Sequence, residues 1–197
     1  MKQTIRNALI LTVITLIAGL CLAAVYEITK QPIADAERAA AMAAYADVFP
    51  ACVVEDRAPE WIPPIEPAPA DGVVIEDYKF AYDGDDFAGI ALRVTSPNGY
   101  GGDVTVAVGV DTDGKLTGIS IISQSETAGL GANCEKPWFT EQFAGITGTV
   151  RWTKTGKSAP DEIDAISGAT VTTKAVTEAV NAGLAFAQEL LKGGTTE

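Results

Sequence analysis

The chain has 197 residues, enough for one compact domain with an anchor and too few for two full domains. Apolar residues make up 47% of it, so we expect a packed core rather than global disorder. The net charge of -12 argues against nucleic-acid binding, which needs a surplus of Lys and Arg. Because the chain has no histidine, a Ser-His-Asp triad and a histidine-bearing zinc site are excluded.

The first predicted element is an apolar helix over residues 8–25, which carry no charge. At ~1.5 Å per residue the run is ~27 Å long, close to the ~30 Å hydrocarbon core of a bilayer. Lys2 and Arg6 precede it and no acidic residue occurs before Glu27. This pattern predicts an uncleaved, single-pass signal anchor with its N-terminus in the cytoplasm and the remaining chain outside. A cleaved signal peptide is the alternative, although residues 22–24 make a poor cleavage site.

Two further segments separate the anchor from the folded domain. The alanine-rich residues 32–45 predict a second helix, with Pro32 in its first turn and Phe49-Pro50 at its end. Five prolines within residues 58–70 exclude a helix and predict a stiff connector or surface loop. We therefore expect an anchor at residues 1–28, a helix and connector at 29–71, and a folded domain at 72–197.

The domain begins near Gly72 with short β-type runs separated by turns. Turn signals lie at residues 83–86 and at Asp113-Gly114. A short helix is predicted around residues 138–143, and an amphipathic helix over 171–191. This order predicts an α+β fold, a mostly antiparallel sheet packed with helices. The predicted strands are residues 73–75, 78–82, 87–95, 104–111, 116–123 and 150–153.

The cysteines leave two readings open. Cys21 lies in the predicted anchor, so Cys52 and Cys134 are the only two in the outer domain. An oxidising compartment permits a disulfide between them. Two unpaired thiols fit the sequence equally well, because spacing alone does not show that the side chains meet. A metal site on two cysteines without histidine is not expected.

The chemistry is expected in the small-residue turn Ser-Gly-Ala-Thr, residues 167–170, directly before the last helix. Free backbone N–H groups and the positive end of the helix dipole meet there, so the turn suits a phosphate. Its small residues leave the backbone open to a large group. The alternative is a plain helix cap, in which Ser167 or Thr170 satisfies the first amides of the helix.

Residues 164–172, Asp-x-x-Ser-Gly-Ala-Thr-x-Thr, resemble the flavinylation motif of the FMN-binding domain family. In that family the last threonine of Ser-Gly-Ala-Thr carries FMN through a phosphoester bond, and here this residue is Thr170. A dedicated flavin transferase, with FAD as the donor, installs the group. The resemblance therefore implies covalent FMN and a flavin transferase as a partner during maturation.

A second pair of motifs supports this resemblance. Residues 99–102, Gly-Tyr-Gly-Gly, and 126–131, Glu-Thr-Ala-Gly-Leu-Gly, follow the order typical of the family, with Ala128 where proline is usual. The resemblance implies that the second motif lies beside the flavin, where Glu126 and Thr127 hydrogen-bond it and the glycines permit close approach. The alternative is an ordinary strand-exit turn. The cofactor-binding candidates are Thr170 as the covalent site, with Ser167, Gly168, Ala169, Thr172, Thr173, Glu126, Thr127, Gly129, Leu130, Gly131 and, as a counter-charge, Lys154.

The resemblance covers about residues 72–190 and extends to the G subunits of Rnf complexes, which are ion-translocating ferredoxin:NAD oxidoreductases. It also extends to the related C subunit of the sodium-pumping NADH:quinone reductase. It implies an electron-transfer subunit without catalysis or a metal site of its own, anchored in inner-membrane lipid beside the other membrane and peripheral subunits. The alternatives are a stand-alone anchored flavoprotein for electron transfer outside the cytoplasm, and a non-redox adaptor whose Ser-Gly-Ala-Thr turn is only a cap.

Overall fold

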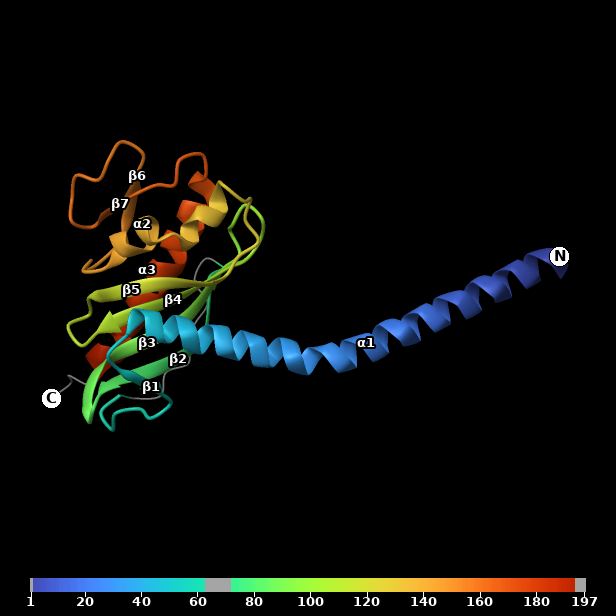
Figure 1. The fold of residues 1–197 in the computed structure, drawn as a ribbon, viewed down its shortest axis with the longest axis horizontal. Coiled ribbons are helices and arrows are strands. Elements are labelled where there is room, and N and C mark those ends of the chain that lie inside the picture. Colours follow the sequence, from blue (N-terminus) through green and yellow to red (C-terminus); the bar gives the residue numbers. More distant parts are fainter. Residues whose placement is uncertain (1, 63–71, 194–197) are drawn as a thin grey trace. The chain divides into compact units, whose positions relative to one another are not determined.

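The computed structural model describes residues 2–62 and 72–193. The chain divides into two compact units, Met1–Ala40 and Ala41–Glu197. The first unit consists of the larger part of helix α1, Lys2–Val48 (Figure 1). Most of the predicted proline-rich connector lies outside the described residues, and its described part, residues 58–62, contains no helix or strand.

Helix α1 differs from the two helices that the sequence predicted. It runs without a break through Pro32, so the prediction of a new helix beginning there was wrong. Proline removes one backbone hydrogen bond, but the leucine- and alanine-rich runs on both sides favour the helix. The helix ends at Val48, directly before the predicted end at Phe49-Pro50. An 18-residue window of mean hydropathy 2.7, with none of it buried, makes α1 long and apolar enough to cross a membrane.

The second unit is built on one antiparallel sheet in the order β1-β2-β3-β4-β5. The turns of two of its hairpins, between β2 and β3 and between β4 and β5, fall at Gly84 and Gly114. Both glycines have a positive φ and lie where the Asp-Gly sequences predicted turns. β4 and β5 have the predicted bounds, whereas β1 was not predicted. The strands are β1 (Val53–Glu55), β2 (Val74–Asp83), β3 (Asp86–Ser96), β4 (Val104–Asp111) and β5 (Leu116–Ser123).

Side chains of β3 and β4 alternate between two cores, as the period of a strand requires. On one face, helix α3 (Thr170–Gly193) packs against both strands. On the other face the strands present Ala91 and Ala107, and these small side chains leave room for Tyr45 and Val48 from the last turns of α1. The strand residues facing α3 are Ile90, Leu92, Val94, Val104, Val106, Val108 and Val110.

Cys52 and Cys134 lie on opposite faces of the sheet, so their side chains do not meet. Cys134 lies in the core under α3, and Cys52 packs against the opposite cluster. Both thiols are free, as is that of Cys21, so the structure agrees with the interpretation in which the thiols are unpaired. Burial raises the pKa of Cys134 to about 12, which leaves it an unreactive thiol at neutral pH.

Short elements lie between β5 and α3. The helix predicted around residues 138–143 is present as two pieces, α2 and η2, and the strand predicted at 150–153 is present as β6. The sequence did not predict the 3₁₀ helix η1 or the strand β7, which pairs in parallel with β6. These elements are η1 (Gly131–Glu135), α2 (Pro137–Thr140), η2 (Glu141–Phe143), β6 (Arg151–Thr153) and β7 (Glu162–Asp164).

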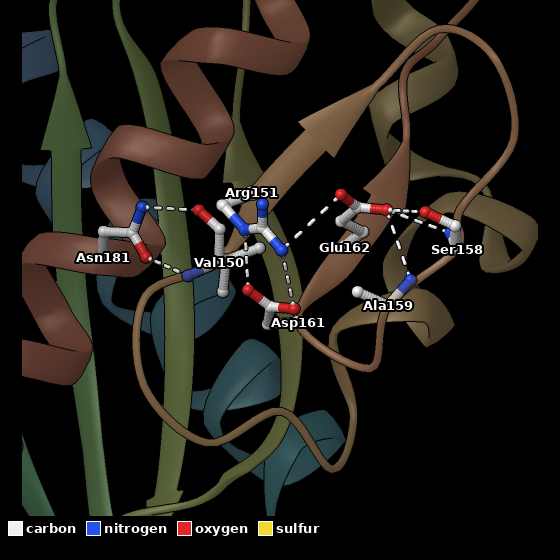
Figure 2. A network of polar contacts seen from close by, with 7 residues as sticks. All are labelled: Val150, Arg151, Ser158, Ala159, Asp161, Glu162 and Asn181. Carbon is white, nitrogen blue, oxygen red and sulfur yellow. Dashed lines mark hydrogen bonds and ion pairs between the residues drawn. The ribbon is translucent and has the colours of Figure 1, made fainter.

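A polar network fastens the β6–β7 segment to α3 (Figure 2). The Asn181 side chain of α3 accepts a hydrogen bond from the Val150 amide at 2.7 Å and donates one to the Val150 carbonyl at 3.0 Å. The Arg151 guanidinium donates two hydrogen bonds to the Asp161 carboxylate, at 2.7 and 3.1 Å. The Glu162 carboxylate accepts the backbone amides of Ser158 and Ala159 and the Ser158 hydroxyl. This network holds the loop that leads into the small-residue turn.

We expect this loop to loosen in acid. The hydrogen bond from Arg151 lowers the pKa of Asp161 below its ordinary value of 3.8, and the Ser158 amide lowers the pKa of Glu162 below 4.5. Because both folded-state pKa values are depressed, their stabilisation is complete above the ordinary values and is lost as the pH falls through the folded ones. Hydrogen exchange should then show falling protection of the Ser158 and Ala159 amides while β4 stays protected. Unchanged protection in acid would contradict this assignment.

Candidate functional site

The buried side chain of Thr173 holds the turn before α3 in place through hydrogen bonds to its backbone. Its hydroxyl accepts a hydrogen bond from the Ile166 amide at 3.0 Å and donates one to the Ala169 carbonyl at 3.0 Å. Gly168 has a φ of 76°, a conformation that glycine adopts without strain. Thr173 is fully buried, so its hydroxyl shapes the turn and does not face outward.

Thr170 stands at the first position of α3 and is half-buried. Within residues 2–62 and 72–193, neither its hydroxyl nor that of Ser167 makes a hydrogen bond, so neither side chain caps the helix. The first turn of α3 also carries no acidic residue. The positive end of the helix and an unused hydroxyl therefore lie together, which suits a phosphate group.

A cavity of ≈ 500 Å³ lies at this helix terminus. Its volume falls in the ~300–1,000 Å³ range typical of ligand pockets. The walls come from three segments, the turn at residues 99–102, the loop at 126–131 and the start of α3. The cavity brings together eight of the candidate residues, which are Glu126, Thr127, Leu130, Gly131, Gly168, Ala169, Thr170 and Thr172.

The remaining candidates do not line this cavity. Thr173 lies beneath the turn, and Ser167 is exposed beside it. Gly129, at a φ of 77°, turns the loop, and its carbonyl accepts a hydrogen bond from the Asn133 side chain at 3.0 Å. Lys154 is exposed, with its ammonium 6.0 Å from the centre of the Trp152 ring.

Glu126 joins the three walls of the cavity. Its Oε1 accepts a hydrogen bond from the Gly101 amide at 3.0 Å, and its Oε2 accepts one from the Thr172 hydroxyl at 2.5 Å. Both carboxylate oxygens are therefore engaged by the chain itself. The resemblance implied Glu126 beside the cofactor, and neither it nor the residue spacing predicted these two contacts.

Two parts of the chain match the models of known protein families. Residues 99–185 match the model of the FMN-binding domain, and residues 1–48 match that of the RnfG N-terminal region. The chain thus contains a region similar to the FMN-binding domain. The matched range includes the glycine-rich turn, the 126–131 loop and the first turns of α3, so every residue that lines the cavity lies inside it.

Its relatives belong to redox complexes. The chain is 40% identical to the G subunit of the Na(+)-translocating ferredoxin:NAD(+) oxidoreductase complex of Acetobacterium woodii, over 53% of this chain and 51% of the relative. It is 44% identical to the proton-translocating counterpart of Clostridium ljungdahlii, over 42% of this chain and 44% of that protein. The chain thus spans about half the length of these two relatives. It is 29% identical to the G subunit of the ion-translocating oxidoreductase complex of Pseudomonas aeruginosa, over 94% of this chain and 89% of that one.

A solved structure shows the same fold. The crystal structure of NqrC from Shewanella oneidensis aligns with a TM-score of 0.51 and 17% identity, over 61% of each chain. The C subunit of the Na(+)-translocating NADH-quinone reductase from Parabacteroides distasonis aligns with a TM-score of 0.47 and 29% identity, over 61% of this chain and 63% of that one.

The cavity also has two apolar lining residues that the sequence analysis did not name as site residues, Tyr100 and Val171. Tyr100 and Val171 line the cavity and are 74% and 48% exposed, and Leu130 beside them is 45% exposed. An aromatic residue between glycines in the 99–102 motif was the available signal for Tyr100. Planar apolar ligands bind against such side chains, so the lining of the cavity and the helix terminus beside it are compatible with a flavin nucleotide.

Proposed function

We propose that this chain is the electron-transfer subunit of a membrane-bound, ion-translocating ferredoxin:NAD oxidoreductase (Rnf) complex, with FMN esterified to Thr170. The unpartnered Thr170 hydroxyl carries the proposal, because it lies at the positive end of α3 in the cavity of an FMN-binding domain. A buried capping hydroxyl would already be engaged with the helix amides. This one is available to form a bond.

The attachment reaction is a phosphoryl transfer. The Thr170 oxygen attacks the FMN phosphorus of FAD, an O–P bond forms, the pyrophosphate bond breaks, AMP leaves, and the hydroxyl proton passes to solvent or to the transferase. The amides at the start of α3 favour the phosphate negative charge. A flavin transferase supplies the catalysis, because the chain has no histidine and its cavity offers no other base beside Thr170 than the doubly hydrogen-bonded Glu126.

Bound FMN accepts and donates one or two electrons, so it links one-electron centres to each other. The chain contributes the binding geometry. Tyr100, Leu130 and Val171 provide apolar surface for the ring, and the small residues 168–169 allow close approach of the ribityl phosphate. A phosphoester keeps the cofactor from dissociating.

The charges beside the N-terminal anchor determine on which side of the membrane the domain lies. We place the N-terminus in the cytoplasm because Lys2 and Arg6 flank the apolar run, and the FMN-binding domain on the outer side of the cell membrane. The partners are then membrane lipid, the flavin transferase during maturation, and the other membrane and peripheral Rnf subunits. The match of residues 1–48 to the RnfG N-terminal region favours a complex subunit over a stand-alone anchored flavoprotein. The free hydroxyls of Ser167 and Thr170 count against a non-redox adaptor with a simple helix cap.

The functional test is genetic complementation. Membranes from a strain that lacks this chain should lose ferredoxin-dependent NAD⁺ reduction, and the wild-type chain should restore it. The Thr170→Val chain, present in the membrane at the same level, should not. Full restoration by Thr170→Val would show that electrons do not pass through a group on this residue.

A further inference from the structure

The Glu126 carboxylate is enclosed by three glycines from two segments. Glu126 is only 9% exposed. A side-chain carbon at Gly99 would lie 2.6 Å from Oε1, and one at Gly131 would lie 2.4 Å from Oε2. The third glycine, Gly101, donates its amide to Oε1. The two motifs therefore close around one carboxylate so tightly that a side chain at Gly99 or Gly131 would force a shift.

The second oxygen of the Glu126 carboxylate contacts the helix that bears Thr170. Thr172, 1% exposed, donates its hydroxyl to Oε2 at 2.5 Å. Thr172 is two residues from Thr170 on the first turn of α3. One carboxylate thus joins the turn that carries Tyr100, the loop that carries Leu130 and the helix terminus. Neither partner of Glu126 is cationic, and no Lys or Arg of the described chain forms an ion pair with it.

We infer that Glu126 is a positioning residue for the flavin, which holds the three cavity walls in register and keeps one uncompensated negative charge beside the ring. This inference rests on the proposed function. Reduction adds electrons to the flavin, and a nearby negative charge in a partly buried site opposes that addition. Glu126 therefore keeps the midpoint potential of the flavin lower than the same cavity would without the charge.

The test uses the full-length chain produced with a flavin transferase. Glu126→Gln preserves the shape, because the amide oxygen accepts from Gly101 and the amide nitrogen donates to Thr172. It should keep wild-type flavin content, and a redox titration should give a more positive midpoint potential.

Glu126→Ala removes both contacts, so flavin content should fall several-fold and iodide should quench the remaining flavin fluorescence more strongly. The matched control is Glu135→Gln, an exposed glutamate outside this cavity, which should leave the potential unchanged because solvent and salt screen its charge.

Two outcomes overturn the inference. The first is a wild-type midpoint potential in Glu126→Gln, since the charge would then not act on the flavin. The second is loss of flavin from Glu126→Gln, since the retained hydrogen bonds would then not hold the site. Both leave the proposed function intact if the wild-type chain carries flavin. A wild-type chain without flavin would instead remove the proposed function itself.

Discussion

Replacing Thr170 with valine is expected to abolish covalent flavin while leaving the fold intact. Valine matches threonine in shape, and the Thr170 hydroxyl makes no hydrogen bond within the described chain that its loss would break. The wild-type chain, produced with the transferase and denatured, should keep yellow colour and in-gel flavin fluorescence. The Thr170→Val chain should show neither.

The matched variant is Thr170→Ser, which keeps a hydroxyl at the same position. It should retain covalent flavin, although the loss of the methyl group can slow attachment. Circular dichroism and thermal unfolding should be the same for all three chains. Fluorescence of Thr170→Val after denaturation would place the bond on another residue.

The Gly131→Ala substitution is expected to separate the 126–131 loop from the first turn of α3. The new carbon would lie 2.4 Å from Glu126 Oε2 and 2.5 Å from the Thr172 hydroxyl oxygen, too close for either to stay. Their hydrogen bond must then break or the loop must shift. Overpacking of this kind costs ~1–3 kcal/mol of the free energy of unfolding. We expect Gly131→Ala to lower the unfolding temperature and to reduce flavin content to a small fraction of wild type.

Gly118→Ala is the control for a glycine-to-alanine change. Gly118 lies in β5, and nothing stands within 4 Å of a carbon added there. Its unfolding temperature and flavin content should stay close to wild type. If Gly131→Ala behaved in the same way, the tight packing between the loop and α3 would not matter for flavin binding.

The fold was predictable where local chemistry and packing agree. β4 and β5 have the predicted bounds because alternating apolar residues and an Asp-Gly turn specify a hairpin without help from distant segments. Pro32 shows the opposite case, since its local preference for a first turn was outweighed by helix-forming residues on both sides. β1 and β7 have three residues each, too few for an alternating pattern, so no sequence pattern marks them. β1 depends on pairing with the distant strand β2, and β7 on a parallel pairing with the preceding strand β6.

The segments of the candidate site were predictable, but their contacts were less so. The small-residue turn before α3 and the 126–131 loop line one cavity, and their role in holding a flavin stays a prediction. The burial of Thr173 and the double hydrogen bond of Glu126 depend on how three segments pack, and spacing does not reveal this. Tyr100 was missed as a site residue because its exposure and its place at the cavity follow from the turn around it.

The most direct test of a flavin on Thr170 is the mass of the tryptic peptide at residues 158–174, from chain purified out of its own membranes. We predict a peptide heavier by one FMN phosphoryl group, with fragment ions that place the added mass on Thr170. The same peptide at its unmodified mass would contradict the covalent attachment and the electron-transfer role that depends on it.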